Sequence, residues 1–170
     1  MQDRSLVDTL AEDPRWDAFG LHDIAEGAAT AALSHLGLAP DGFEISLMGC
    51  DDARIAVLNT EFRGKPKPTN VLSWPSEDRM AEDEGGTPEP PEPGEEDDPE
   101  SLGDIAIAWE TCEREAAQQK KPMKDHVTHL VIHATLHLMG YDHETEADAE
   151  LMEGIEIAIL GGLGLANPYE

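Results

Sequence analysis

The sequence predicts a single α+β domain. Segments with alternating apolar side chains, typical of strands, are interspersed with segments whose apolar side chains recur at helical spacing. The chain has 170 residues, 39% of them hydrophobic, which is enough for one domain with its own core. No stretch approaches the ~18 consecutive apolar residues that a membrane-spanning helix needs, so no membrane partner is expected.

The first predicted elements are a helix over 16–36 and a strand over 43–48. Apolar residues from Trp16 to Leu36 fall on one helical face, and Gly37 ends the pattern. Apolar and polar residues then alternate along 43–48, as expected for a strand with one buried face.

A second helix and a short strand follow. Asp51 or Asp52 is suited to cap a helix that runs through Phe62. Residues 64–68 are then predicted to form a loop, and 69–74 a strand that a proline stops.

Residues 76–101 are predicted to form a disordered acidic loop. The segment contains five prolines and three glycines, and 77–100 carry twelve acidic residues and one basic residue. Such a composition cannot bury a core. Because strand-like segments flank it, it is an insertion within one domain spanning 1–170. We interpret it as a solvated spacer, with a protein-binding loop as the alternative.

The remaining elements are a strand and three helices, followed by a tail. Pro122 separates the first two helices, and the first of them ends in lysines, which suits the helix dipole. Residues 161–170 are glycine-rich and are predicted to be flexible. The predicted strand covers 102–108, and the helices cover 109–121, 124–139 and 144–160.

The charge of the chain argues against nucleic acid if taken as a sum, because 37 acidic and 11 basic residues give −26. Its distribution leaves room for a small basic cleft. Ordinary solvated surface is the alternative explanation of the clusters. The basic residues gather in two short stretches, Arg63, Lys65 and Lys67 in one and Lys120, Lys121 and Lys124 in the other.

The cysteine content and the N-terminus favour the cytoplasm. Cys50 and Cys112 are far apart in the sequence and are expected to be buried free thiols in a reducing compartment. Residues 1–15 are polar and acidic and lack the apolar stretch of a signal peptide.

The most informative motif is the run His133, His137, Gly140 and His143, with the spacing H-x-x-x-H-x-x-G-x-x-H. Two histidines four residues apart lie on one helical face. Gly140 can end the helix in a left-handed conformation and turn the chain back, so that His143 faces the other two. Three neutral imidazoles with an open fourth position predict a catalytic zinc site with one ion per chain, although nickel or copper suits the same ligands.

The same spacing occurs in metzincin peptidases, where a glutamate follows the first histidine and acts as the general base. Ala134 occupies that position here, and its methyl group cannot accept a proton. His126 and His129 lie on the same broad helical face and are expected to be core residues or partners of the ligands. Asp142 either orients a ligand or caps the next helix.

Three motifs resemble those of the YbeY endoribonucleases, also called rRNA maturation factors. The run HATLHLMGYDH is similar to the family signature H-G-x-L-H-L-x-G-Y-D-H, with Ala134 in place of the usual glycine. The runs LNTEFR and PTNVLSWP, over 58–63 and 68–75, resemble L-N-x-x-[YF]-R and P-T-[DN]-V-L-S-F-P. The run GDIAI over 103–107 resembles the family's G-D-I-x-I strand.

The resemblance implies a zincin-like fold, with a small mixed sheet packed against helices. It implies a zinc-dependent, single-strand-specific endoribonuclease in 16S rRNA 3′-end maturation and ribosome quality control. An rRNA precursor, the small ribosomal subunit and an assembly GTPase are the partners it suggests. Arg63 matches the family's functionally important arginine and is a candidate to pair with phosphate. The candidate catalytic residues are therefore Arg63, His133, His137 and His143, with Arg63, Lys65 and Lys67 contacting RNA.

Two other functions stay open at this point. A ribosome-assembly factor that uses zinc only to hold its fold agrees with the acidic surface. A zinc peptidase or amide hydrolase agrees with the histidine spacing but not with Ala134. Asp104 and Asn70 are expected to be buried polar contacts. Neither the general base nor the choice between attack by water and attack by the ribose 2′-OH can be assigned.

Overall fold

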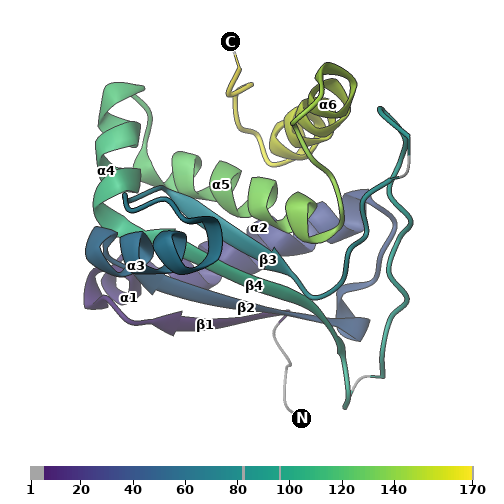
Figure 1. Ribbon diagram of the computed structural model, residues 1–170, viewed down its shortest axis with the longest axis horizontal. Coiled ribbons are helices and arrows are strands. Elements are labelled where there is room, and N and C mark those ends of the chain that lie inside the picture. The colour runs from purple at the N-terminus through teal and green to yellow at the C-terminus, as the bar shows by residue number, and fades with distance from the viewer. Residues whose placement is uncertain (1–5, 82, 96, 170) are drawn as a thin grey trace.

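A four-stranded mixed β-sheet forms the centre of the molecule (Figure 1). The computed structural model describes residues 6–81, 83–95 and 97–169, without the side chain of Arg63. Three strands run parallel, and the fourth is antiparallel to its neighbour at one edge. In spatial order the strands are β1 (Val7–Ala11), β2 (Phe43–Cys50), β4 (Glu100–Ala108) and β3 (Val71–Pro75).

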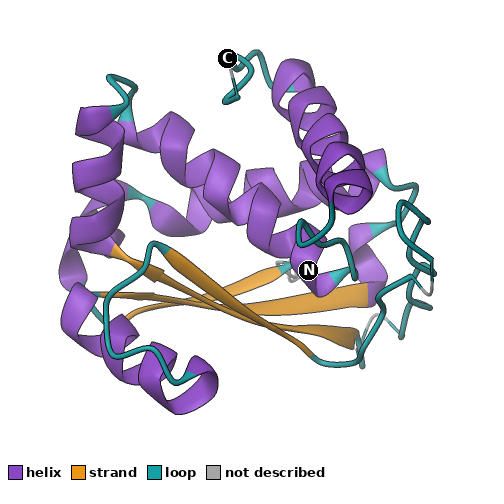
Figure 2. Cartoon of the chain, turned by 45° about the horizontal axis from the view of Figure 1, so that its top comes forward, coloured by secondary structure: helices purple, strands orange, loops and turns teal. Residues whose placement is uncertain are grey.

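Helices cover both faces of this sheet unequally (Figure 2). Two long helices, α2 (Leu21–His35) and α5 (Met123–Leu138), pack on one face, and α3 (Asp52–Arg63) packs on the other. The architecture confirms the predicted α+β fold with a small mixed sheet. The remaining helices are α1 (Pro14–Phe19), the 3-10 turn η1 (Pro40–Gly42), α4 (Trp109–Gln118) and α6 (Glu146–Gly162).

The alternation of side chains along β4 builds two hydrophobic cores. Ile105 and Ile107 point to the main core under α2 and α5, whereas Ala106 and Ala108 point to a smaller core under α3. The small side chains let α3 approach the sheet closely, and the large ones fill the space under the long helices. Each fully buried Ile contributes about 1.5–3 kcal/mol to folding, so the main core fixes the position of α5 on the sheet.

The N-terminal region differs from the prediction in two ways. The strand β1 was missed, because its alternation is short and its pairing partner β2 lies more than thirty residues later. The predicted helix over 16–36 is two helices, because Gly20 adopts φ +89° between α1 and α2. This break lets Trp16 enter the core, where its indole Nε1 donates to the Cys50 carbonyl over 2.9 Å.

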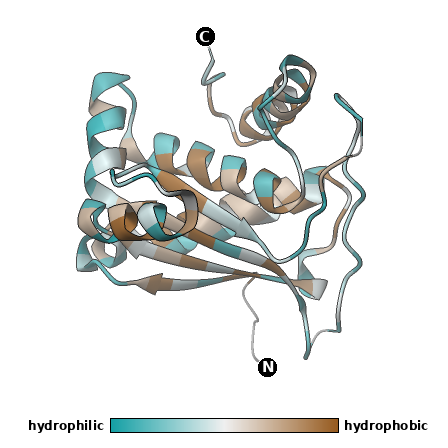
Figure 3. Cartoon of the chain, viewed as in Figure 1, coloured by the Kyte–Doolittle hydropathy of each residue, from teal (hydrophilic) through white to brown (hydrophobic). Residues whose placement is uncertain are grey.

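The acidic segment after β3 is irregular but is held to the body of the protein. It follows the edge of the molecule as a mostly hydrophilic chain (Figure 3). Arg79 Nη1 donates to the Leu138 carbonyl at the end of α5 over 3.0 Å, and Gly85 N–H donates to Asp148 of α6. Disorder was predicted for 76–101; the last two of these residues belong to β4 instead, and the disorder of the rest stays a prediction.

The C-terminal tail was predicted to be flexible over 161–170, and the first two of these residues belong to helix α6. The helix α6 extends to Gly162, and the described residues beyond it fold back, so that the Tyr169 hydroxyl donates to Glu156 of α6. The cysteine prediction is confirmed, since Cys50 and Cys112 are buried and unbonded to each other. Within the described ranges, no helix has the length and apolar character to cross a bilayer.

Candidate metal centre

The end of α5 brings the three predicted histidines together. His133 and His137 are one turn apart on the helix, and Gly140, at φ +103°, directs the chain back over the last turn. Tyr141 N–H then donates to a carbonyl of that turn, which locks the reversal. His143 thus returns toward the helix, as the position of the glycine predicted.

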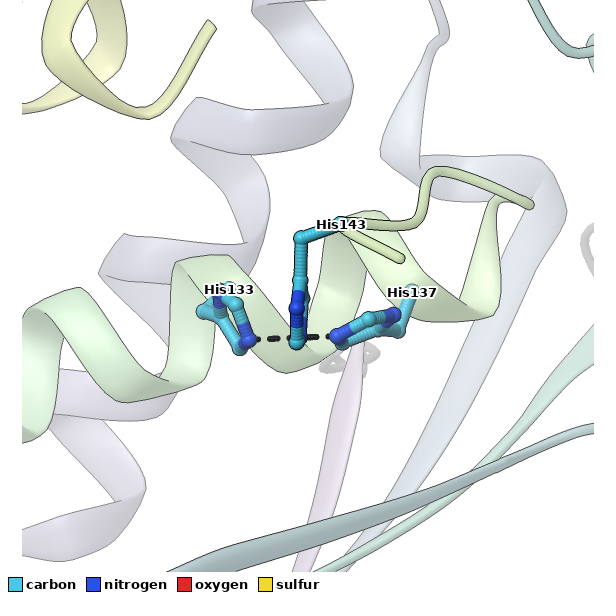
Figure 4. A group of neighbouring side chains, drawn as sticks. All are labelled: His133, His137 and His143. Carbon is cyan, nitrogen blue, oxygen red and sulfur yellow. Dashed lines mark hydrogen bonds between the residues drawn. The ribbon is translucent and has the colours of Figure 1, made fainter. Parts of the chain in front are cut away.

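The three imidazole rings converge on one point (Figure 4). Ring centroids lie 4.6 Å apart for His133 and His137, 5.3 Å for His133 and His143, and 5.1 Å for His137 and His143. One nitrogen from each ring lies within 4.8 Å of the other two. The three residues can therefore act as ligands of one metal ion.

In two of the rings, a hydrogen bond made by Nδ1 determines that Nε2 is the nitrogen available to a metal ion. His137 Nδ1 donates to the Tyr141 carbonyl over 3.0 Å, and His133 Nδ1 donates to Glu156 Oε2 over 2.8 Å. The proton of each neutral ring is therefore on Nδ1, and Nε2 carries a lone pair. Burial, together with His133 and His143 alongside, lowers the pKa of His137 to about 4, so this ring is neutral near pH 7.

The distance between these two lone pairs fits a metal ion. His133 Nε2 and His137 Nε2 face each other at 3.1 Å. Two lone pairs at this distance repel unless a cation or a proton lies between them. In a tetrahedral zinc site with Zn–N distances of about 2.0–2.1 Å, two ligand nitrogens lie roughly 3.3 Å apart. The donor set and its spacing therefore suit zinc.

Glu156 on α6 is a candidate residue of this centre that the sequence motifs did not indicate. Its side chain is fully buried, and it accepts hydrogen bonds from His133 and from His129 Nε2, the latter over 2.7 Å. Burial opposes its ionisation, but the hydrogen bonds from His129 and His133 lower the pKa of Glu156 to about 2. The sequence did hold a signal for a buried carboxylate. Glu156 lies between Ile155 and Ile157 and one helical turn after Met152, on the apolar face of the helix.

His126 and His129 contact carboxylates, as expected for partners rather than ligands of this centre. His126 is buried with its Nε2 2.9 Å from Glu115, and His129 faces Glu156. His129, His133 and Glu156 are also close enough together to form a second group of potential ligands.

The histidine centre lies between two cavities, which share Ser73, His137 and His143. The first has a volume of about 420 Å³, and Asn70, Lys121 and Tyr169 are among its lining residues. The second has a volume of about 550 Å³ and is strongly acidic. Its charged lining residues are Glu77, Asp78, Arg79, Asp142 and Glu144.

The structure does not bring the predicted basic residues together with the histidines. Arg63 is the last residue of α3, and its side chain lies outside the described part of the structure. Lys65 and Lys67 are exposed in the following loop, which Asn59 Nδ2 anchors at the Lys67 carbonyl over 3.0 Å. Neither lysine lines the two cavities beside the centre, whereas Lys121 lines the first of them.

Three polar predictions can be checked against the structure. Asp142 does not cap the next helix, because Thr145 does so, and its Oδ1 accepts from His143 N–H over 2.7 Å. Asp104 is exposed on the outer face of the sheet, so its prediction as a buried contact was wrong. Asn70 does hold neighbouring elements, donating to Glu115 over 3.0 Å.

The mixed sheet, the helix that carries two converging imidazoles and the adjoining cavities form a candidate three-histidine metal centre, an arrangement typical of metal-dependent hydrolases. A family model described as "Endoribonuclease YbeY" matches residues 7–164. The chain belongs to the YbeY endoribonuclease family.

Similar proteins agree over nearly the whole chain. The chain is 57% identical over 167 residues to "Endoribonuclease YbeY" of Dinoroseobacter shibae, covering 98% of this chain and 92% of that protein. It is 60% identical over 164 residues to the protein of that name from Cereibacter sphaeroides, covering 96% and 98%. The solution structure of TM1509 from Thermotoga maritima has the same fold, with a TM-score of 0.55, 20% identity, and coverage of 93% and 91%.

Proposed function

We propose that this protein is a zinc-dependent endoribonuclease that cuts single-stranded RNA during maturation of the 16S rRNA 3′ end and in ribosome quality control. The observation that carries the proposal is the convergence of His133, His137 and His143 beside an open cavity. Membership of the YbeY family supports the substrate class. One zinc ion per chain and a cytoplasmic location are part of the proposal, and two buried free thiols agree with the location.

The residues of the centre have separate tasks in this proposal. His133, His137 and His143 hold the ion through neutral imidazoles, and the Nδ1 hydrogen bonds of the first two keep their rings oriented. A bound zinc ion lowers the pKa of its water towards about 7 and polarises a phosphoryl oxygen, both of which assist phosphodiester cleavage. Arg63 pairs with the phosphate through its guanidinium group, which matches two phosphate oxygens at once.

The proposed RNA contacts come from the segment before the edge strand β3 and from the cavity beside the histidines. Arg63, Lys65 and Lys67 precede this strand, and Lys121 lines the cavity beside the histidines. The second cavity beside the histidines carries four carboxylates and only one guanidinium group, and this net negative charge repels a phosphate backbone. We therefore propose that the RNA strand occupies the cavity that Lys121 lines. The rRNA precursor and the small ribosomal subunit are the proposed partners, and an assembly GTPase is a further candidate.

The second candidate function is a ribosome-assembly factor in which zinc mainly stabilises the fold. The acidic cavity and the net charge of −26 favour docking to a basic protein surface over binding of free RNA. A peptidase activity has less support, because Ala134 is buried beside the centre and offers no base.

A substrate panel separates these functions. The zinc-loaded protein is incubated with a single-stranded 16S rRNA 3′-end precursor, a duplex of the same sequence, the precursor within small ribosomal subunits, and a peptide mixture. We expect cleavage of the single-stranded precursor alone or within the subunit, and none after zinc removal. A 2′,3′-cyclic phosphate on the product identifies attack by the ribose 2′-OH, whereas a free 3′-hydroxyl with a 5′-phosphate on the other fragment identifies attack by water. No RNA cleavage, together with rescue of subunit assembly, would establish the assembly factor instead.

Replacing Arg63 with glutamine is expected to lower the cleavage rate about 10²–10³-fold, the usual cost of removing one donor to a developing negative charge. Zinc content should stay unchanged, because Arg63 is not among the ligands. Arg54→Gln on the same helix is the matched control, since Arg54 pairs with Glu12 on the surface. A rate within twofold of wild type for Arg63→Gln would show that this arginine has no role in the reaction.

A further inference from the structure

The buried carboxylate of Glu156 is the part of the site that the ligand set does not explain. Its side chain has no exposed surface. Among the described residues, it is the only carboxylate that is fully buried. Burying an ionised carboxylate costs several kcal/mol unless donors surround it. Three donors do so here, two from helix α5 and one from the tail: His129, His133 and Tyr169.

Each oxygen of this carboxylate has its own donors. Oε2 accepts from His133 Nδ1 over 2.8 Å, while Oε1 accepts from His129 Nε2 over 2.7 Å and from the Tyr169 hydroxyl. The carboxyl plane therefore cannot rotate without breaking hydrogen bonds on both sides. Since the His133 proton is fixed on Nδ1, the lone pair of its Nε2 is directed at His137.

The same atoms could instead form a second metal site, since His129, His133 and Glu156 lie close together. The distances favour hydrogen bonds. Nitrogen and oxygen are 2.7–2.8 Å apart in both histidine pairs, which suits a charge-assisted N–H···O⁻ bond. An ion between them, with bonds of about 2.0–2.2 Å to each, needs more space.

We propose that Glu156 is a positioning residue that fixes the tautomer and orientation of His133 for metal binding, and that Tyr169 of the C-terminal tail holds Glu156 in place. The inference rests on the metal centre of the proposed function but not on its RNA substrate. It links the tail to the ligands, because the Tyr169 hydroxyl and the His133 imidazole bind the two oxygens of one carboxyl group.

The test is the isosteric substitution Glu156→Gln, compared with Glu150→Gln, an exposed carboxylate of the same helix. Zinc affinity is measured by competition with a chromophoric chelator, and Co²⁺ is used as a spectroscopic probe of the ligands. We expect zinc affinity to fall about 10–100-fold in Glu156→Gln, as for other partners of metal-bound histidines, with a shifted Co²⁺ visible spectrum. Glu150→Gln should leave both unchanged. A folded Glu156→Gln protein with wild-type zinc affinity and Co²⁺ spectrum would overturn the proposal.

A second measurement needs no substitution. In the metal-free wild-type protein above neutral pH, long-range ¹H–¹⁵N correlation spectra report which nitrogen of His133 carries the proton. We expect His133 to be protonated on Nδ1, and Tyr169→Phe to increase the share of the other tautomer. A wild-type His133 protonated on Nε2 would overturn the proposal even if Glu156→Gln failed to fold. Because neither readout uses RNA, both remain valid if the protein cleaves none, and two zinc ions per chain would indicate the second metal site.

Discussion

Replacing His137 with alanine is expected to reduce bound zinc from one ion per chain to nearly none and to abolish RNA cleavage. The loss should be large because His137 is the central ligand: its ring lies within 4.6–5.1 Å of both others. Two imidazoles and water bind zinc far more weakly than three, and we expect the cleavage rate to fall at least ~10³-fold, in line with the contribution of an activated metal-bound water. Zinc content is measured by mass spectrometry after purification without a nickel column, and cleavage on the single-stranded precursor.

The matched control is His35→Ala, because His35 is an exposed histidine in the last turn of α2, away from the centre. This variant should keep full zinc and full activity. If His137→Ala retained stoichiometric zinc, the three-histidine assignment would be refuted. Zinc loss without any loss of RNA cleavage would show that the metal takes no part in the reaction.

Replacing Gly140 with alanine is expected to destabilise the protein by about 3 kcal/mol or more and to weaken zinc binding. Gly140 has φ +103°, which an L-residue adopts only at a cost of about 1–3 kcal/mol. A Cβ there would lie 2.3 Å from the Arg79 carbonyl oxygen, so the acidic segment would also have to move, adding about 1–3 kcal/mol as in other overpacked sites. Relief of the backbone strain and relief of the clash with Arg79 would both displace the turn that returns His143 to the centre.

Urea unfolding of the metal-free protein measures the first effect, and chelator competition the second. Gly154→Ala is the control, because Gly154 lies in helix α6 with nothing within 4 Å of an added Cβ. That substitution should stabilise the protein by roughly 0.5–1 kcal/mol, as alanine is the better helix former. An unfolding midpoint for Gly140→Ala equal to that of wild type would mean that the turn tolerates a side chain.

The ligands were predictable because their geometry is local. Helical spacing places His133 and His137 on one face, and Gly140 allows the reversal that returns His143, all within eleven residues. The helix over 52–63 was likewise predictable from its cap, since Asp51 accepts from Arg54 N–H over 2.8 Å.

Elements that depend on distant partners were not predictable in the same way. The short strand β1 exists because β2 pairs with it, and Gly20 divided a helix whose apolar pattern continues on both sides. The acidic segment was expected to be solvated throughout, but Arg79 donates a hydrogen bond to a carbonyl at the end of α5. Composition predicts how well a segment is solvated. It does not predict that one guanidinium group will donate a hydrogen bond to an unpaired carbonyl at the end of a helix.

The sequence by itself therefore determined the class of fold, the family and the three potential metal ligands, because local spacing and motif order carry that information. Only the tertiary structure decided which groups complete the centre. Glu156 of α6 hydrogen-bonds to His133, and Tyr169 of the tail hydrogen-bonds to Glu156, so both groups lie more than twenty residues along the chain from His133. A buried carboxylate is stable only where several donors converge, and that convergence is set by how α6 and the tail pack over α5.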